Sequence, residues 1–217
     1  MFAYCNNNPV NMEDQDGNLP GWAKKLVAAV AVVAVVAAVA AVTVATAGAG
    51  TAAAVIAVGA VKGAAVGMIT GAAIGAGTGA VGHRIRTGSW EGAGQAALEG
   101  AASGALSGSI SGAISGAASS AYKVAQAAKA WSPGTGKSGY TSMKYHYNKH
   151  ALQEGFSKGN SVLKYTDDAL NFANRNSSVL KFTYNYKYHN ATWNFAYKGG
   201  MGGEFTSVGK IVTFWYK

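Results

Sequence analysis

The chain has 217 residues and a formal net charge of +9, with 49% hydrophobic and only 12% charged residues. A single cysteine, Cys5, excludes an intramolecular disulfide framework and a cysteine-based zinc cluster. Residues 132–217 hold 11 of the 18 Lys and Arg residues, 4 of the acidic residues and 17 of the 23 aromatic residues. This composition indicates a polyanionic partner, either nucleic acid or an anionic membrane surface, and the mixing of aromatic with basic residues favours nucleic acid. The simpler alternative is a basic surface without a ligand.

The first 21 residues are polar and turn-rich, and they lack the basic start and apolar core of a signal peptide. They resemble the end of the core domain of Rhs/YD-repeat proteins, where a Tyr-x-x-Asn-x-Pro-Val-Asn run leads into Asp-Pro-x-Gly and a variable toxin follows. The matching residues are Tyr4, Asn7, Asn8, Pro9, Val10, Asn11, Asp14 and Gly17, and Gln15 replaces the proline. The resemblance implies that residues 1–21 end an Rhs core-like segment, whose aspartates are linked in that family to autocleavage. It also implies a polymorphic toxin that is secreted or delivered from the cell surface as part of a larger protein, and acts in the cytoplasm of a target cell.

Residues 22–130 are rich in Ala, Gly and Val and are expected to be helical. Leu26–Val61 contains no charged residue and exceeds the roughly 20 apolar residues that span a bilayer, and Gly63–Gly82 is a second, weaker apolar stretch. From Gly100 onward small residues recur at every fourth position, a spacing that lets helices approach closely. The region resembles the pre-toxin delivery segments of polymorphic toxins, with membrane contact expected through residues 26–61. A low-complexity spacer is the alternative.

Two short stretches in and after this region are interpreted as connections. A solvated connector without chemistry is expected at His83, Arg84 and Arg86. Residues 131–141, where Pro and Gly cluster, are expected to be a linker. The linker contains Gly-Thr-Gly-Lys-Ser, but no glycine stands at the first position of a P-loop motif and no apolar strand precedes it, which excludes a nucleoside triphosphate site.

Residues 142–217 are expected to form a basic toxin domain of the α+β class, with two helices followed by an antiparallel sheet of about four strands. The first predicted helix runs from Ser142, as its N-cap, to Gly155, and the second covers 160–176 with Asn160 or Ser161 as cap. Alternation of aromatic and polar residues then predicts the strands. They are expected at 180–188, 192–198, 204–208 and 210–216, with a flexible turn at 199–203.

The first of these helices carries the candidate chemistry. His146 and His150 are four residues apart and therefore share one helical face, with Lys144 and Lys149 nearby. RNA supplies its own nucleophile, the 2′-hydroxyl, so that cleavage needs only a base, an acid and cations to stabilise the transition state. Histidine can be either the base or the acid near neutral pH.

The domain also resembles the colicin D type of tRNA-cleaving toxin, within the barnase–EndoU–colicin–RelE group of small ribonucleases. The matching segments are Asn148-Lys-His-Ala151 with Gly155-Phe156, and Thr213-Phe-Trp215. Asn148 replaces the first lysine of that motif, whose role is then expected at Lys144; the order Gly-Phe is reversed; and Thr213 replaces a serine.

The predicted roles follow from this chemistry and this resemblance. The candidate catalytic residues are His150, favoured over His146, and Lys149 and Thr213. The candidate RNA-binding residues are Lys144, Lys210 and Trp215, whereas His189 is expected to be a turn residue. No metal or cofactor is expected. A zinc site made by the two histidines with Glu154 is a minor alternative, and Tyr147 replaces the catalytic glutamate of a His-Glu-x-x-His metalloprotease motif.

The sequence therefore predicts a toxin whose C-terminal domain is a metal-independent endoribonuclease. It would cleave RNA, with tRNA as a candidate, by transesterification to a 2′,3′-cyclic phosphate, and an acidic cognate immunity protein would cover its basic cleft. Two alternatives remain open. The apolar region could form a membrane pore while the basic domain only binds, or the basic domain could be a non-catalytic nucleic-acid-binding module with strongly salt-dependent affinity.

Overall fold

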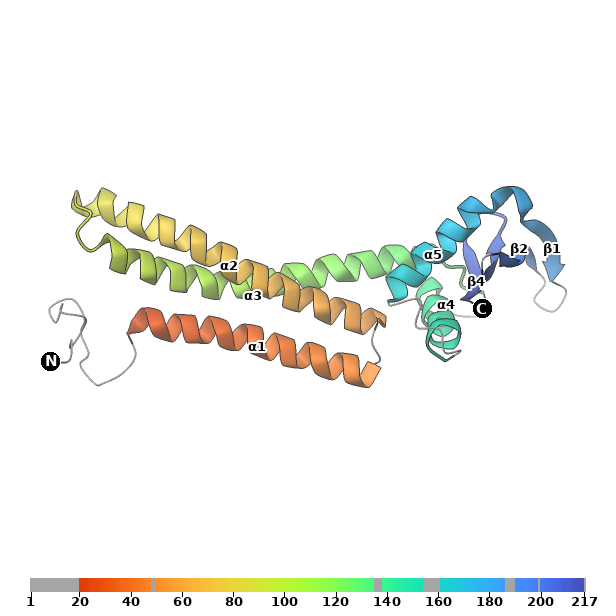
Figure 1. Cartoon of the computed structure of the whole chain (residues 1–217), viewed down its shortest axis with the longest axis horizontal. Helices are drawn as coiled ribbons and strands as arrows, with labels where there is room; N and C mark the ends of the chain where they lie inside the picture. Colours follow the sequence, from red (N-terminus) through yellow and green to blue (C-terminus); the bar gives the residue numbers. More distant parts are fainter. Residues whose placement is uncertain are drawn as a thin grey trace. The chain divides into compact units, whose positions relative to one another are not determined.

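The computed structural model describes residues 20–47, 50–134, 138–153, 161–185, 190–198 and 200–216. Contacts within the chain group it into two compact units. The first contains α1 up to Ala40 together with Val58–Ala117, and the second contains Ala41–Ala57 and Ala118–Lys217. The chain is α+β, as predicted (Figure 1). Its elements are α1 (Gly21–Ala47), α2 (Ala52–Thr87), α3 (Ala93–Lys129), α4 (Gly139–His146), the π-helix η2 (Tyr147–Gln153), α5 (Val162–Arg175), the 3₁₀ helix η3 (Ser177–Val179), β1 (Lys181–Asn185), β2 (Asn190–Lys198), β3 (Met201–Thr206) and β4 (Ile211–Tyr216).

The apolar region is helical, as expected, but its divisions differ from the sequence prediction. The uncharged stretch Leu26–Val61 is not one helix, because α1 ends at Ala47 and α2 begins at Ala52. Gly50 between them has φ 82°, a left-handed conformation that only glycine adopts without strain. The expected connector at residues 83–86 belongs to the last turns of α2, and the connection to α3 follows it at residues 88–92.

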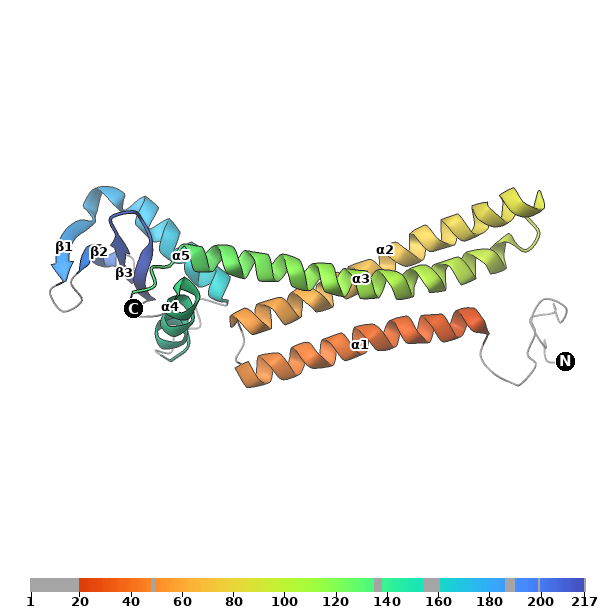
Figure 2. The same cartoon turned by 180° about the vertical axis from the view of Figure 1, so that it is seen from behind.

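In the first unit, a ladder of glycines joins α2 to α3, which lie side by side in both views (Figures 1 and 2). A Cβ atom added at Gly67 would lie 2.0 Å from the carbonyl oxygen of Gly108, and one at Gly71 would lie 2.1 Å from that of Gly104. The same opposition recurs along both helices, at the pairs Gly59–Gly116, Gly63–Gly112, Gly67–Gly108, Gly71–Gly104, Gly75–Gly100 and Gly79–Ala96. The prediction of close helix packing from the small-residue spacing is confirmed.

Away from this ladder, the first unit is packed through alanines and exposes large apolar side chains. Ala29 on α1 and Ala105 on α3 are fully buried, and Lys25 Nζ donates to Ser103 Oγ at 3.0 Å. Ile69 and Ile74 on α2, by contrast, are about two-thirds exposed. In this unit the interior is made of the smallest residues, and many larger apolar residues lie on the outside.

The second unit is built around an antiparallel sheet with strand order β1-β2-β3-β4. Helix α5 packs on β3 and β4 through Tyr165 and Phe172, whose rings contact Phe214 and Phe205. The prediction of two helices followed by four antiparallel strands is confirmed. The expected turn at 199–203 is wrong from Met201 onward, because β3 begins there and Gly202 and Gly203 pair with β4.

Of the two helix caps predicted from the sequence, one is confirmed and one is wrong. Ser161 caps α5, with its Oγ accepting from Lys164 N at 3.2 Å, as predicted for one of two candidates. The predicted cap at Ser142 is wrong. Ser138 caps α4 instead, and Ser142 is buried inside the helix, where its N–H donates to the Ser138 carbonyl at 3.1 Å.

Trp131 was expected to begin a linker but lies in the core of the second unit, with 1% of its surface exposed. Its neighbours pair with the edge strand β4: Ser132 N donates to Ile211 O at 2.7 Å, and Ile211 N donates to Ala130 O at 2.8 Å. The indole Nε1 donates to Thr166 Oγ1 on α5 at 3.0 Å. The end of α3 is thereby joined to both the sheet and α5.

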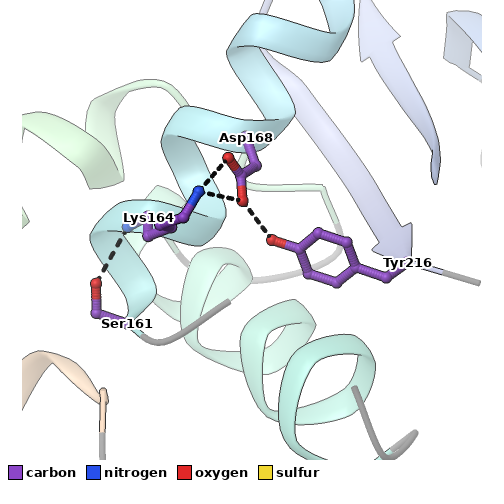
Figure 3. A network of polar contacts seen from close by, with 4 residues as sticks. All are labelled: Ser161, Lys164, Asp168 and Tyr216. Atoms are coloured by element: carbon purple, nitrogen blue, oxygen red, sulfur yellow. Dashed lines mark hydrogen bonds and ion pairs between the residues drawn. The ribbon is translucent and has the colours of Figure 1, made fainter. Parts of the chain in front are cut away.

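A polar network fixes the end of β4 against α5 (Figure 3). The Tyr216 hydroxyl donates to Asp168 Oδ2 at 2.8 Å, and Lys164 Nζ binds both Asp168 oxygens at 2.8 and 3.0 Å. Burial, with Asp168 adding to it, raises the pKa of Tyr216 above its ordinary value, so this hydroxyl keeps its proton. The network holds the strand that carries Thr213.

Candidate functional site

His146 and His150 lie on one face of the continuous segment formed by α4 and η2, as predicted. Their rings are stacked, with centroids 5.6 Å apart and planes at 10°. The segment changes from α-helix to π-helix after His146, an irregularity that often marks functional positions in proteins.

Thr213 on β4 contacts both imidazoles. Its Oγ1 lies 3.1 Å from His146 Nδ1 and 3.5 Å from His150 Nε2. The strand has a bulge beside Thr213, since Glu204 pairs with Thr213 whereas Phe205 pairs with Ile211, and bulges re-aim neighbouring side chains. A hydroxyl has one proton, so Thr213 can donate to one ring and accept from the other. Three of the four predicted catalytic residues therefore meet, from segments more than 60 residues apart.

Trp131 completes this cluster and was not anticipated from the sequence as a site residue. Its ring stacks on His146 at 5.6 Å and 16°, and on Tyr165 at 5.6 Å and 19°. Burial first, and then the charges of His150 and Lys149, lower the pKa of His146 to about 4. His146 is therefore neutral at pH 7, and its ring stacks on Trp131 and on His150, which makes it suited to hold Thr213 in place.

Among the described contacts, no hydrogen bond or ion pair joins the predicted cations Lys144, Lys149 and Lys210 to this cluster. Lys149 and Lys144 are exposed on the same helical segment, and Lys149 Nζ lies 5.9 Å from the centre of the Tyr145 ring. Lys210 is exposed in the turn before β4, where its N–H bonds to Thr206 Oγ1. No described contact brings the Lys210 side chain to the histidines.

Trp215, the predicted stacking residue, is half-buried on β4 two residues beyond Thr213. Its indole lies over the backbone of Gly202, where an added Cβ would come within 2.5 Å of the ring. Glycine at position 202 is what lets the ring lie there. The other predicted positions, Glu154, Gly155-Phe156 and His189, lie outside the described residues, as do residues 1–19 of the Rhs-like segment.

Within the described part of the chain, no group of three or more His, Cys, Asp or Glu side chains is arranged to hold a metal ion. Comparison of the chain with protein-family models, with curated proteins and with solved structures found no match. The functional interpretation therefore depends on the chemistry of this cluster and on the sequence resemblances described above.

Proposed function

We propose that the second unit is a metal-independent endoribonuclease that cleaves by attack of the 2′-hydroxyl on the adjacent phosphate. The observation that carries the proposal is the meeting of His146, His150 and Thr213 at the edge of β4. A hydroxyl placed between two imidazoles can pass or orient a proton near neutral pH, which is what this reaction requires.

The roles follow from the environment of each group. His150 contacts Thr213 through its Nε2 and moves the proton at the reacting oxygen. His146, neutral and partly buried, positions Thr213, whose hydroxyl contacts a non-bridging phosphate oxygen. Exposed Lys149 and Lys144 attract the phosphate backbone, since lysine contributes a point charge that does not require one geometry.

RNA would be held through an unpaired base as well as its phosphates. Trp215 lies two residues from Thr213 on the same strand, and aromatic rings bind unstacked bases of single-stranded loops. A tRNA, with its exposed loops, is the substrate that the resemblance to colicin D-type toxins favours. The same resemblances support delivery as part of a larger Rhs-type toxin and neutralisation by an acidic immunity protein.

The test uses the full chain incubated with total tRNA in excess EDTA and analysed on a denaturing gel. We expect discrete fragments from the wild type, none from His150→Asn, and an unchanged pattern from His83→Ala, a matched histidine variant at the end of α2. Intact RNA from a folded wild-type protein would reject the proposal. If that RNA is nevertheless bound in a salt-dependent manner, the non-catalytic binding module becomes the interpretation.

A second function is favoured by a specific observation in the apolar region. Two helices, Gly21–Val44 and Ala52–Thr87, are long and apolar enough to cross a membrane by length and composition, and only 11% and 17% of their most apolar windows are buried. We propose that this region contacts a bilayer during delivery or as a pore. Release of an encapsulated dye from anionic vesicles by full-length His150→Asn would support the membrane activity, and vesicles that stay intact at micromolar protein would oppose it.

A further inference from the structure

Transesterification of RNA needs two proton transfers, and only His150 in the cluster described above is suited to one of them. One group must take the proton of the 2′-hydroxyl, and another must give a proton to the leaving 5′-oxygen. His146 is poorly suited to either task, because its Nδ1 contacts Thr213 and burial lowers its pKa to about 4, so that it is a weak base and carries no proton to donate near neutral pH. His150 can perform one of the two proton transfers, so a second proton-transfer group is needed.

Glu204 stands on β3, the strand next to the one that carries Thr213. It is directly opposite Thr213 in the register of β3 and β4, and residues directly opposite in antiparallel strands place their side chains on the same face, with Cβ atoms about 5 Å apart. The next pair on this face is Gly202 with Trp215. Thr213, Trp215 and Glu204 thus share one face of the sheet.

The opposite face of the same two strands is apolar and covered. Phe205, Phe214 and Tyr216 are buried there against α5. Glu204 is therefore not part of the core of the second unit. It is a half-buried carboxyl on the face of the sheet opposite α5, across from the strand position that contacts both histidines.

The surroundings of Glu204 suit proton transfer. No hydrogen bond or ion pair of its carboxyl occurs among the described residues, and burial raises its pKa above the ordinary 4.5. The α4–η2 segment, which contacts β4, carries the cations Lys144 and Lys149 besides the two histidines, and Lys210 precedes β4. Asn194 of β2 pairs with Glu204 on its other side, and Tyr216 of β4 lies on the opposite face with Asp168. Thr213, the cross-strand neighbour of Glu204, contacts His150, and a carboxyl with a raised pKa and an imidazole in one site can act as a base and acid pair.

We infer that Glu204 is the second proton-transfer group of the site, an inference that rests on the proposed ribonuclease function. Its carboxylate takes the proton of the 2′-hydroxyl as the 2′-oxygen forms a bond to phosphorus. The bond from phosphorus to the 5′-oxygen breaks, and the protonated imidazole of His150 gives its proton to that oxygen. The products are a 2′,3′-cyclic phosphate and a free 5′-hydroxyl, and a proton returned through water from Glu204 to His150 restores the site.

The test is the pH dependence of kcat/KM for cleavage of total tRNA by the full chain in EDTA. For the wild type we expect a bell-shaped profile whose acidic limb lies above pH 4.5, because Glu204 must be ionised. Glu204→Gln should lose about 100-fold or more in rate and lose the acidic limb, since general base catalysis contributes roughly 10²–10⁴-fold. Glu204→Asp should retain the limb, and Glu99→Gln on α3 should match the wild type.

The outcomes separate this inference from the function on which it rests. Cleavage that needs His150 but is within threefold of wild type in Glu204→Gln, with the same pH profile, would overturn the role of Glu204 alone. A pH profile of the wild type without an acidic limb would also overturn the role of Glu204, even if Glu204→Gln failed to fold. A wild type that cleaves no RNA would overturn both.

Discussion

The glycine ladder between α2 and α3 predicts that replacing glycine by alanine lowers the stability of the protein at one position of α2 and raises it at another. At Gly67 an added Cβ would lie 2.0 Å from the Gly108 carbonyl oxygen and 2.8 Å from its carbon, whereas nothing lies within 4 Å of a Cβ at Gly77 or Gly82. Non-bonded carbon atoms normally approach to about 3.5–4.0 Å. Alanine at Gly67 must therefore push the two helices apart by more than about 1 Å.

The size of each effect can be estimated from these contacts. Alanine in place of a helical glycine stabilises a helix by up to about 1 kcal/mol, and overpacking costs about 1–3 kcal/mol. We expect Gly67→Ala to lower the free energy of unfolding by about 1–2 kcal/mol once the helical gain is subtracted, and Gly77→Ala to raise it by up to about 1 kcal/mol.

The assay is thermal unfolding of the full chain followed by far-UV circular dichroism, which reports mainly on α1, α2 and α3. Gly67→Ala should melt below the wild type and Gly77→Ala above it. Equal melting temperatures for the two variants would refute the close packing of α2 on α3. Gly82→Ala provides a second control at another open position.

Three other predictions concern the second unit. Because the pKa of His146 is about 4 in the folded protein against 6.5 ordinarily, its neutral form contributes stability that is full above pH 6.5 and lost as the pH falls toward 4. At about 1.4 kcal/mol per pKa unit, and with allowance for its partial exposure, the loss is about 2–3 kcal/mol, measured by urea unfolding, and His146→Gln should abolish this dependence. Gly202→Ala should displace the Trp215 ring, seen as a changed indole signal in NMR, and weaken RNA binding by roughly tenfold, since stacking contributes about 1–3 kcal/mol per base; an unchanged indole signal would contradict the packing. Tyr216→Phe should lower the free energy of unfolding by about 1–2 kcal/mol through loss of the hydrogen bond to Asp168. A change below about 0.3 kcal/mol, which is within the scatter of additive mutational effects, would show that the bond contributes nothing to stability.

The elements that the sequence predicted well are those specified by local periodicity. The apolar face of α5 follows from residues spaced three and four apart, and the strands follow from alternation, so both could be placed without tertiary information. The cap of α4 was misplaced because Ser138 and Ser142 are both suitable residues one turn apart, and the choice depends on where the chain enters the helix.

The candidate site was predicted only in part, because some of its residues meet only through contacts between distant segments of the chain. The stacking of His146 and His150 follows from their spacing on one helix, but the part played by Trp131 depends on pairing between the end of α3 and β4, some 80 residues later. Glu204 stands in a short strand with no motif around it. Its place opposite Thr213 depends on strand register and on a bulge, neither of which composition or periodicity reveals.

The chemistry of the cleaved ends tests the central claim most directly. Full-length protein should be incubated in EDTA with a tRNA, and the fragments analysed for their terminal groups. The cleavage sites should then be substituted with 2′-O-methyl nucleotides. The account predicts 2′,3′-cyclic phosphate and 5′-hydroxyl ends, and complete resistance of the methylated RNA. Fragments with 5′-phosphate ends, or cleavage that survives 2′-O-methylation, would contradict a mechanism based on the 2′-hydroxyl and the pair His150 and Thr213.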